Sequence, residues 1–280
     1  MKIVVKINKF EDMKILDNAD AYLVSNAKVS YRYDDSFSLS LIKKTLNEAK
    51  KNKKELYVLV NKIFFDNELD ALDKFIKALI DMNIDGIYFA DFAVFMICEK
   101  YNYQNKCYFY HETFLRNSKD IKTYQELGIK NIICSKDMNL DDIKDLDPHY
   151  KDNYGIMCFG YIPLYESKRK IISNYKKQYG VDVNQDSKKM YIKEETRDNK
   201  YKIIEQNGTT SVFHDKVLSY IPYLDILDNY LNIFIIDSLF FDVNYIKNIV
   251  NIVKNKDINA ILDNKYEYDS LFLDKKVGLI

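Results

Sequence analysis

The sharpest chemical signal in the sequence is the adjacent pair His111-Glu112, which follows a short apolar run. A histidine next to a carboxylate can bind a metal ion or transfer a proton. The residues that follow are Thr113, Phe114 and Leu115, so the second histidine of an HExxH zinc-protease motif is absent. The pair therefore indicates proton transfer rather than zincin chemistry, and a structural role for His111 is the alternative.

Further candidates stand where other apolar runs end. Asp91 is a second carboxylate, and Asn61 and Asp237 are polar groups that could contact a substrate. If the runs are parallel strands of a barrel, their carboxyl ends share one active-site face. A cap or loop hydrogen bond is the alternative for each residue. The sequence has no GxSxG motif and no cysteine in the context of an activated nucleophile, so acyl-enzyme chemistry has no support.

Arginine is rare in this chain, so its positions are informative. There are 42 basic and 42 acidic residues, and only four of the basic residues are arginines: Arg32, Arg116, Arg169 and Arg197. A guanidinium group can hold a carboxylate or phosphate through two parallel hydrogen bonds. We expect Arg32, Arg169 and Arg197 on the same side of the fold as the strand ends, and we add Tyr175 and Glu194 to the expected substrate-binding set. Chance retention or internal pairing with nearby acids is the alternative.

The zero net charge argues against a general binder of nucleic acids or membrane surfaces. We therefore do not expect the single chain to bind nucleic acid, although Lys168-Arg169-Lys170 is a local basic patch. The chain has no apolar run of about 18 residues and no secretory leader pattern, which predicts a cytoplasmic protein with no membrane contact. Its four cysteines form no CxxC pair, which indicates reduced, buried thiols rather than a metal or redox site: Cys98, Cys107, Cys134 and Cys158. We expect no cofactor, and the sequence does not identify a catalytic metal.

The elements that must position these residues alternate between strand and helix. Two segments, 67–82 and 243–253, repeat apolar residues at helical spacing, and Ser38 and Asn139 stand where helix caps belong. Continuously apolar strands that alternate with helices indicate a parallel sheet covered by helices. The expected strands are 2–7, 21–25, 56–61, 86–90, 107–110, 131–135, 155–159 and 232–237.

Eight such units close most simply into a TIM-like (β/α)8 barrel, whose usual length of about 250 residues suits one domain spanning residues 1–280. A doubly wound open sheet is the alternative, although no glycine-rich nucleotide motif supports it. The connection at about 161–214, between the seventh and eighth strands, is unusually long. Three alternating runs and the Asn207-Gly208 hairpin signal predict a small antiparallel insertion there, with strands at 190–195, 200–206 and 209–213.

Several of these segments together resemble the U32 peptidase family, the collagenase-like proteases of bacteria and archaea. The most specific is FGYIPLYESKRKIISNY at 159–175, which is similar to the family motif that ends in Ser-x-Arg-x-Leu-Leu-Ser-x-Tyr. SYRYDDSFSL at 30–39 is similar to an aromatic-Arg-x-Ser stretch, and DGIYFADFAVF at 85–95 to a strand-to-helix pattern. GIKNIICSKDMNLDDIK at 128–144 and the hairpin segment at 191–213 extend the resemblance.

The resemblance implies a TIM-like barrel that acts as a peptidase on a peptide or peptide-like substrate at the barrel mouth. In this leading hypothesis Glu112 or Asp91 is the base that activates water, with His111 beside them. Arg169 then polarises or anchors a carbonyl or carboxylate. A small anionic ligand is the other partner that these groups could bind.

Some members of the family hold an iron–sulfur cluster through four cysteines and support oxygen-independent hydroxylation of ubiquinone precursors or RNA bases. Two of those cysteine positions correspond here to Pro163 and Lys170. The resemblance therefore implies a short, single-domain form without a cluster. Two alternatives to a peptidase follow. One is a cluster-free component of an RNA- or small-molecule-hydroxylating system, whose arginines bind an anionic donor or phosphate. The other is a non-catalytic barrel that binds a partner, such as a related family member.

Overall fold

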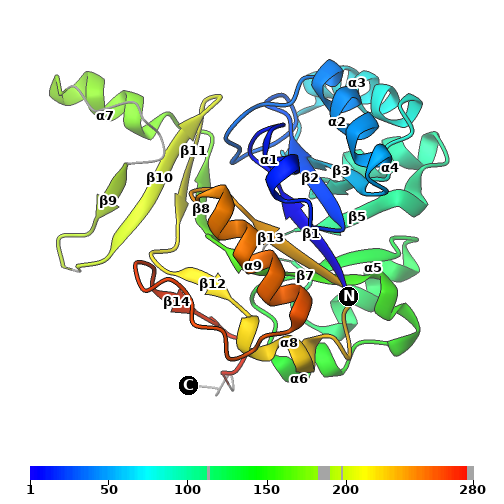
Figure 1. Ribbon diagram of the computed structural model, residues 1–280. Coiled ribbons are helices and arrows are strands. Elements are labelled where there is room, and N and C mark those ends of the chain that lie inside the picture. Colours follow the sequence, from blue (N-terminus) through cyan, green and yellow to red (C-terminus); the bar gives the residue numbers. More distant parts are fainter. Residues whose placement is uncertain (112–113, 182–189, 197, 276–280) are drawn as a thin grey trace.

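The strands form a closed parallel barrel (Figure 1). The computed structural model describes residues 1–111, 114–181, 190–196 and 198–275. Within them, the barrel strands are β1 (Lys2–Lys6), β2 (Ala21–Ser25), β3 (Glu55–Val60), β4 (Gly86–Phe89), β5 (Cys107–Tyr110), β6 (Asn131–Cys134), β7 (Tyr154–Gly160) and β13 (Ile233–Asp237). They pair in this order, and β13 pairs with both β7 and β1, which closes the ring. The predicted (β/α)8 barrel is confirmed, and the doubly wound alternative is wrong.

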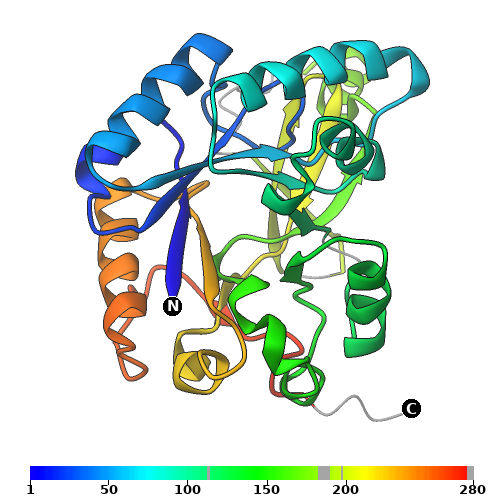
Figure 2. The same cartoon turned by 90° about the vertical axis from the view of Figure 1, so that its right-hand side faces the viewer.

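Helices surround this ring of strands (Figure 2). The apolar stripe predicted in residues 67–82 is the buried face of α3, and the predicted caps are present. Ser38 Oγ accepts a hydrogen bond from the Leu41 N–H, and Asn139 Oδ1 accepts one from the Asp142 N–H. The helices outside the barrel are α1 (Asp12–Ile15), α2 (Leu39–Lys51), α3 (Leu69–Asp81), α4 (Phe92–Lys100), α5 (Ser118–Glu126), α6 (Leu140–Lys144), α8 (Leu224–Leu227) and α9 (Val243–Asn255). Short 3-10 turns are η1 (Asp66–Glu68), η2 (Gln104–Lys106), η3 (Pro148–Asn153) and η5 (Ile221–Tyr223).

The long connection after β7 forms a second, antiparallel sheet, as predicted. Its strands, in spatial order, are β8 (Pro163–Ser167), β11 (Thr209–Phe213), β10 (Lys200–Gln206) and β9 (Tyr191–Lys193). Helix α7 (Ile171–Tyr179) follows β8 and projects away from the barrel (Figure 1). Asn207 and Gly208 both have positive φ angles, 50° and 78°, as a tight hairpin turn requires. That residues 1–280 form one domain stays a prediction.

Three short strands were missed in the sequence. β8 has no alternation of apolar and polar residues, because most of its side chains are exposed. β12 (Val217–Ser219) pairs antiparallel with β7, and β14 (Tyr268–Asp269) pairs with β12. Strands of two or three residues carry too little periodic signal to stand out from a loop.

The amino-terminal half of the barrel interior is filled by an aromatic and charged layer. The ring of Tyr57 packs edge-on against Tyr88 and Tyr108, with 5.2 Å between ring centroids in both pairs. Lys2 Nζ lies 2.7 Å from Glu55 Oε2 and donates to the Tyr57 hydroxyl. Side chains therefore fill this end of the barrel interior, as in other barrels of this kind.

At the carboxyl end of the strands, a buried ion pair joins the first and last strands of the ring. Lys6 Nζ lies 2.9 Å from Asp237 Oδ2 and donates a 2.7 Å hydrogen bond to the Arg32 carbonyl oxygen. Only 4% of Lys6 is exposed. Ser238 Oγ donates to the Lys6 carbonyl oxygen, and Asn8 Nδ2 donates to the Ser238 carbonyl oxygen. The pair thus fastens β13 to β1 and fixes the loop after β2.

The buried cysteines fit the expectation from the sequence. Cys98, Cys107, Cys134 and Cys158 are buried and form no disulfide. Burial raises the pKa of the Cys134 and Cys158 thiols to about 12. Among the described residues, no helix is both long and apolar enough to cross a bilayer.

Close strand packing makes Gly155 a sensitive position. A methyl group at Gly155 would lie 2.7 Å from Ile233 Cβ and 2.8 Å from Ile133 Cδ1, so neighbouring strands would have to move. We expect Gly155→Ala to lower the free energy of unfolding by roughly 1–3 kcal/mol, measured by urea denaturation. Gly180→Ala is the control, because a methyl there meets no atom within 4 Å and adds only backbone strain. An unchanged denaturation midpoint for Gly155→Ala would contradict the packing described.

The Lys6–Asp237 pair gives a second stability prediction. Lys6→Met leaves the part-buried Asp237 carboxylate without its cation, so we expect a loss of roughly 2–4 kcal/mol in the free energy of unfolding, less than for a fully buried charge. The double variant Lys6→Met/Asp237→Leu removes both charges and is expected to be clearly more stable than the single variant. Urea denaturation of the wild type and the variants measures this difference. Equal stability of the single and double variants would mean that the two charges do not interact.

Candidate functional site

A cavity of about 240 Å³ opens at the carboxyl ends of the barrel strands. It is lined by residues from the ends of strands β3, β4 and β5, from the loops after β2 and β6, and from strand β8 of the insertion. A smaller cavity of about 20 Å³ lies beneath it and is lined by Lys6 and Asp237, among others. The polar groups that line the larger cavity are Tyr31, Arg32, Asn61, Tyr110, His111, Lys136, Tyr165 and Glu166. The antiparallel insertion thus forms one wall of the barrel mouth.

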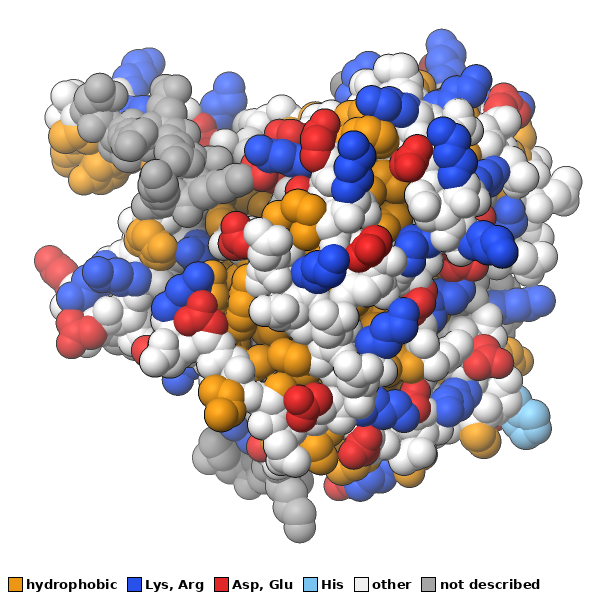
Figure 3. Space-filling model, in the orientation of Figure 1, with side chains coloured by type: hydrophobic (Ala, Val, Ile, Leu, Met, Phe, Trp, Pro, Cys, Tyr) orange, Lys and Arg blue, Asp and Glu red, His pale blue; other side chains and the backbone are white. Residues whose placement is uncertain are grey.

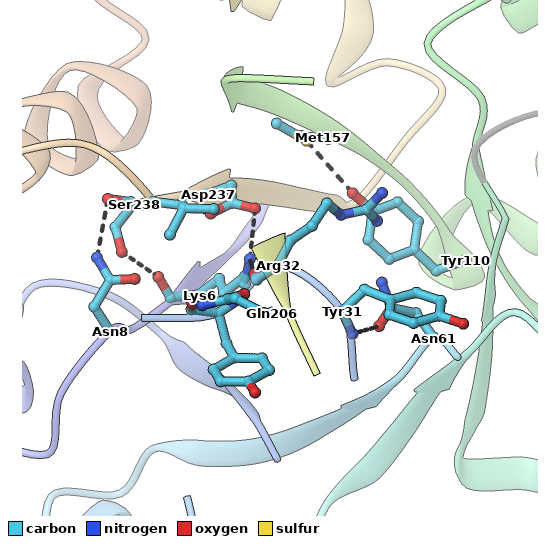
Figure 4. Close-up of polar contacts among 12 residues, drawn as sticks. Lys6, Asn8, Tyr31, Arg32, Asn61, Tyr110, Met157, Gln206, Asp237 and Ser238 are labelled. Carbon is cyan, nitrogen blue, oxygen red and sulfur yellow. Dashed lines mark hydrogen bonds and ion pairs between the residues drawn. The ribbon is translucent and has the colours of Figure 1, made fainter. Parts of the chain in front are cut away.

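Arg32 is the central cation of this site and lines both cavities. The residue is only 8% exposed, and its guanidinium lies 3.5 Å from Glu166 Oε1. Its backbone has a φ angle of +57°, a conformation that costs energy for a residue with a side chain. Lys6 holds the Arg32 carbonyl oxygen in this conformation. Figure 4 shows the Arg32 side chain reaching across the barrel toward Tyr110.

Asn61 and Tyr110 complete the inner wall. Asn61 Oδ1 accepts a 2.9 Å hydrogen bond from the Tyr31 N–H, so the end of β3 fixes the backbone just before Arg32. The Tyr110 hydroxyl donates to Met157 Sδ at 3.4 Å, from β5 across to β7 (Figure 4). The predicted placement of Asn61 at the cavity is therefore observed, and its role is to position the arginine loop as well as to line the cavity.

His111 and Lys136 stand on the opposite side of the mouth. The His111 ring stacks on the Phe114 ring with 4.1 Å between centroids. Burial lowers the pKa of His111 below its ordinary value of 6.5, so the imidazole is mainly neutral at pH 7. Lys136 Nζ lies 3.1 Å from Asp137 Oδ1, at the rim. A neutral imidazole that lines the same cavity as Arg32 and Lys136 can donate a hydrogen bond to an anion bound there or exchange a proton with it.

The structure places the predicted base Asp91 in a different role. Its Oδ1 accepts from the Ala93 N–H and caps helix α4, and its Oδ2 accepts from the Phe64 N–H. Asp91 does not line the mouth cavity. The alternative that the sequence left open, a helix cap, describes its contacts. Asp237 also has a structural partner, because its Oδ1 accepts from the Leu239 N–H, but it does line the smaller cavity.

The remaining predicted residues lie elsewhere. Arg169, Tyr175 and Glu194 are exposed on the insertion and do not line the mouth cavity. Arg169 lies in the turn between β8 and α7 and lines neither of the two cavities that Arg32 lines, so the shared site that the sequence had suggested for the two arginines is not seen. Glu112 and Arg197 lie outside the described residues.

Sequence reasoning passed over Lys6, Lys136 and Glu166. Lys6 could have been found, because a lysine that interrupts the apolar run KIVVKI at an inward-facing position needs a buried partner. Lys136 lies two residues after the end of β6, and this place at a strand end is the signal that could have identified it. Glu166 had no signal of its own, since its position depends on the unrecognised strand β8.

The cysteines of this chain do not fit an iron–sulfur cluster. A [4Fe–4S] cluster needs about four thiolates within reach of one another. All four cysteines are among the described residues, and no group of three or more potential metal ligands occurs in that part of the chain. Pro163 lines the mouth cavity and Lys170 immediately precedes α7, so neither position supplies a thiolate there.

Comparisons with known proteins point to one family. Residues 8–276 match the model of peptidase family U32. The chain is 24% identical over 257 residues to "tRNA hydroxylation protein P2" of Bacillus subtilis (strain 168), which covers 90% of this chain and 83% of that protein. It is 25% identical over 183 residues to "tRNA hydroxylation protein P1" of the same strain, covering 62% of this chain and 42% of that protein. The match thus spans less than half the length of P1.

A solved structure supports the same fold. "The Structure of the U32 Peptidase Mk0906" superposes with a TM-score of 0.52 at 11% identity, covering 84% of this chain and 91% of that one. The leading prediction, a peptidase, is contradicted by the curated relatives, which are named for tRNA hydroxylation. The fold and the family model nevertheless agree with the resemblance seen in the sequence: the chain belongs to peptidase family U32.

Proposed function

We propose that this protein is a component of a tRNA hydroxylation system and that its barrel-mouth cavity binds a small anionic molecule used in that reaction. The observation that carries the proposal is the buried guanidinium of Arg32 at the cavity. The names of the curated relatives supply the reaction. The alternative drawn from the sequence, a cluster-free component of an RNA-hydroxylating system, is thus the one that we develop.

The charges around the cavity favour an anion. Among the lining residues, Arg32 and Lys136 contribute two cations and Glu166 contributes one carboxylate, while Asp137, which pairs with Lys136, lies outside the lining. Because Arg32 is almost fully removed from water, its interaction with an anionic ligand is screened less than at the surface. A carboxylate or phosphate group can take two parallel hydrogen bonds from a guanidinium. The neutral His111 imidazole can donate a third.

The shape of the cavity favours a small organic ligand. Its volume is about 240 Å³, and three of its lining residues are tyrosines, Tyr31, Tyr110 and Tyr165, whose rings can pack against a planar group. Strand β8 closes one side of the mouth. These features support a compact anion with an unsaturated or ring-shaped body.

A second protein is part of this proposal. Hydroxylation of a C–H bond is a two-electron oxidation, and the cysteines of this chain do not fit the cluster that other members of the family carry. We propose that a related family member supplies the redox centre, while this chain holds the anionic ligand. The occurrence of two relatives, P1 and P2, in Bacillus subtilis supports a system of two different family members.

Arg32 provides the sharpest test. We expect a strain in which the gene carries Arg32→Lys to contain at least about tenfold less hydroxylated tRNA nucleoside than the parent, because a lysine cannot make the paired hydrogen bonds. Mass spectrometry of nucleosides from purified tRNA measures this ratio. Arg116→Lys is the matched control, since the Arg116 side chain is 57% exposed and does not line the cavity, and a lysine there can keep the ion pair with Asp137.

Two outcomes count against the proposal. If a strain without the gene has the same hydroxylated nucleosides as its parent, the protein has no part in tRNA hydroxylation. If the deletion removes the nucleoside but a strain with Arg32→Lys contains the parental amount, the protein takes part in hydroxylation but Arg32 does not bind an anion that the reaction needs. Western blotting of both arginine variants checks that they accumulate equally.

A further inference from the structure

Helix α7 and the turn before it form a surface outside the barrel, and the start of the turn contacts the barrel loops: Lys168 Nζ donates to the Ile63 carbonyl oxygen and lies over the Phe65 ring. None of the side chains of α7 is buried. Its first turn is fixed to the insertion sheet, because the Glu205 carboxylate accepts hydrogen bonds from the Ile172 and Ser173 N–H groups at 2.8 and 3.1 Å. Thr210 Oγ1 accepts from the Ile171 N–H and donates to the Arg169 carbonyl oxygen. The helix is thus held firmly at one end while its side chains face solvent.

This surface is basic within a chain of zero net charge. Residues 161–214 contain 11 lysines and arginines against 7 acids, whereas the whole chain has 42 of each. The excess is concentrated between 167 and 181, where five basic residues occur and no Asp or Glu: Lys168, Arg169, Lys170, Lys176 and Lys177. The global balance that argued against nucleic-acid binding therefore hides a local excess of positive charge.

Two exposed tyrosines stand among these cations. Tyr175 and Tyr179 are one helical turn apart, 53% and 60% exposed, with 4.7 Å between their ring centroids. Hydrophobic and basic side chains of α7 lie side by side at the projecting end of the insertion (Figure 3). Unpaired bases of single-stranded RNA stack on such rings, and lysines and arginines neutralise the neighbouring phosphates.

From this surface we infer a specific role: α7 and its preceding turn bind a single-stranded segment of RNA. Tyr175 and Tyr179 stack against bases, and the cations around them pair with phosphates. That the RNA is a tRNA rests on the proposed function. Strand β8 connects this surface to the mouth cavity, because Tyr165 lines the cavity and Arg169 lies just beyond the strand. The RNA bound on α7 thus leads toward the barrel mouth.

A protein partner is the rival occupant. The main argument for a protein partner is the exposed row Ile171, Tyr175 and Tyr179, which has the spacing of a helix face that docks on another protein. Lysine, however, is depleted at protein–protein interfaces, and this surface is rich in it. The absence of acids between 167 and 181 also suits a polyanion better than a mixed protein surface. The composition therefore favours RNA.

The test measures binding of a fluorescently labelled single-stranded RNA oligonucleotide to the purified full-length protein by fluorescence anisotropy. We expect Tyr175→Ala/Tyr179→Ala to bind at least about tenfold more weakly, since stacking contributes roughly 1–3 kcal/mol per base. Tyr175→Phe/Tyr179→Phe keeps both rings and is expected to bind like the wild type. Because the two tyrosines are exposed, circular dichroism should show equal folding in all three proteins.

The salt dependence of RNA binding provides a second, independent test of the phosphate contacts. Lys176→Gln/Lys177→Gln is expected to reduce the slope of log Kd against log salt concentration by about 1.4, because each lost phosphate contact removes about 0.7 for a single strand. Lys43→Gln/Lys51→Gln, on the outer helix α2, makes the same change of charge and should leave the slope unaltered. Equal slopes in the two double variants would overturn the role of α7.

Each outcome is distinguishable from failure of the proposed function. If the wild type does not bind the oligonucleotide, or if the alanine variant binds as tightly, the inference is wrong even when the gene is needed for tRNA hydroxylation. If the alanine variant instead loses a complex with a related family member while RNA binding is unchanged, α7 is a protein-docking element. If RNA binding depends on α7 but the gene is dispensable for hydroxylation, the RNA-binding inference is supported and the proposed function is wrong.

Discussion

The buried pair of Lys6 and Asp237 is the interaction on which the rest of this structure depends. It joins the first and last strands of the ring, and the same ammonium group holds the Arg32 carbonyl oxygen. A lysine with so little exposure is stable only when its charge and its hydrogen-bond donors are satisfied. One cation therefore closes the barrel and also fixes the strained loop that carries the main cation of the site.

The site combines segments that are far apart in the sequence. Arg32 comes from the loop after β2, Lys136 from the loop after β6, and Glu166 from the insertion that follows β7. The barrel strands form the base of the mouth cavity, and the insertion forms one of its walls. In our inference, the insertion also binds the RNA next to this cavity. Under our proposal, this division explains how a member of a family with a peptidase name takes part in a different reaction, since a barrel fixes the fold while the loops at its carboxyl face determine the chemistry.

The sequence predicted the barrel well, because its strands are short, continuously apolar runs separated by helical periodicity. It also predicted the hairpin at Asn207-Gly208 and the placement of Asn61 and Arg32 at the mouth. It was less informative where a residue's role depends on tertiary contacts. Asp91 stands at a strand end, where a catalytic acid was expected, but it caps α4. Arg169 belongs to the segment that resembles the family motif, but it is exposed in the turn before α7. The family name was the most misleading signal, since a peptidase name carried over from a fold says nothing about the groups in the cavity.

The most direct test of this account is the activity of Lys6→Met/Asp237→Leu, in which the charges are removed but the barrel has apolar side chains in their place. Nucleoside mass spectrometry would compare a strain that carries this variant with its parent, after circular dichroism has shown that the purified variant is folded. We predict that hydroxylated tRNA nucleoside falls strongly, because Arg32 loses the ammonium group that holds its backbone. The parental amount of hydroxylated nucleoside in a strain with the folded variant would contradict the claim that this pair positions the functional arginine.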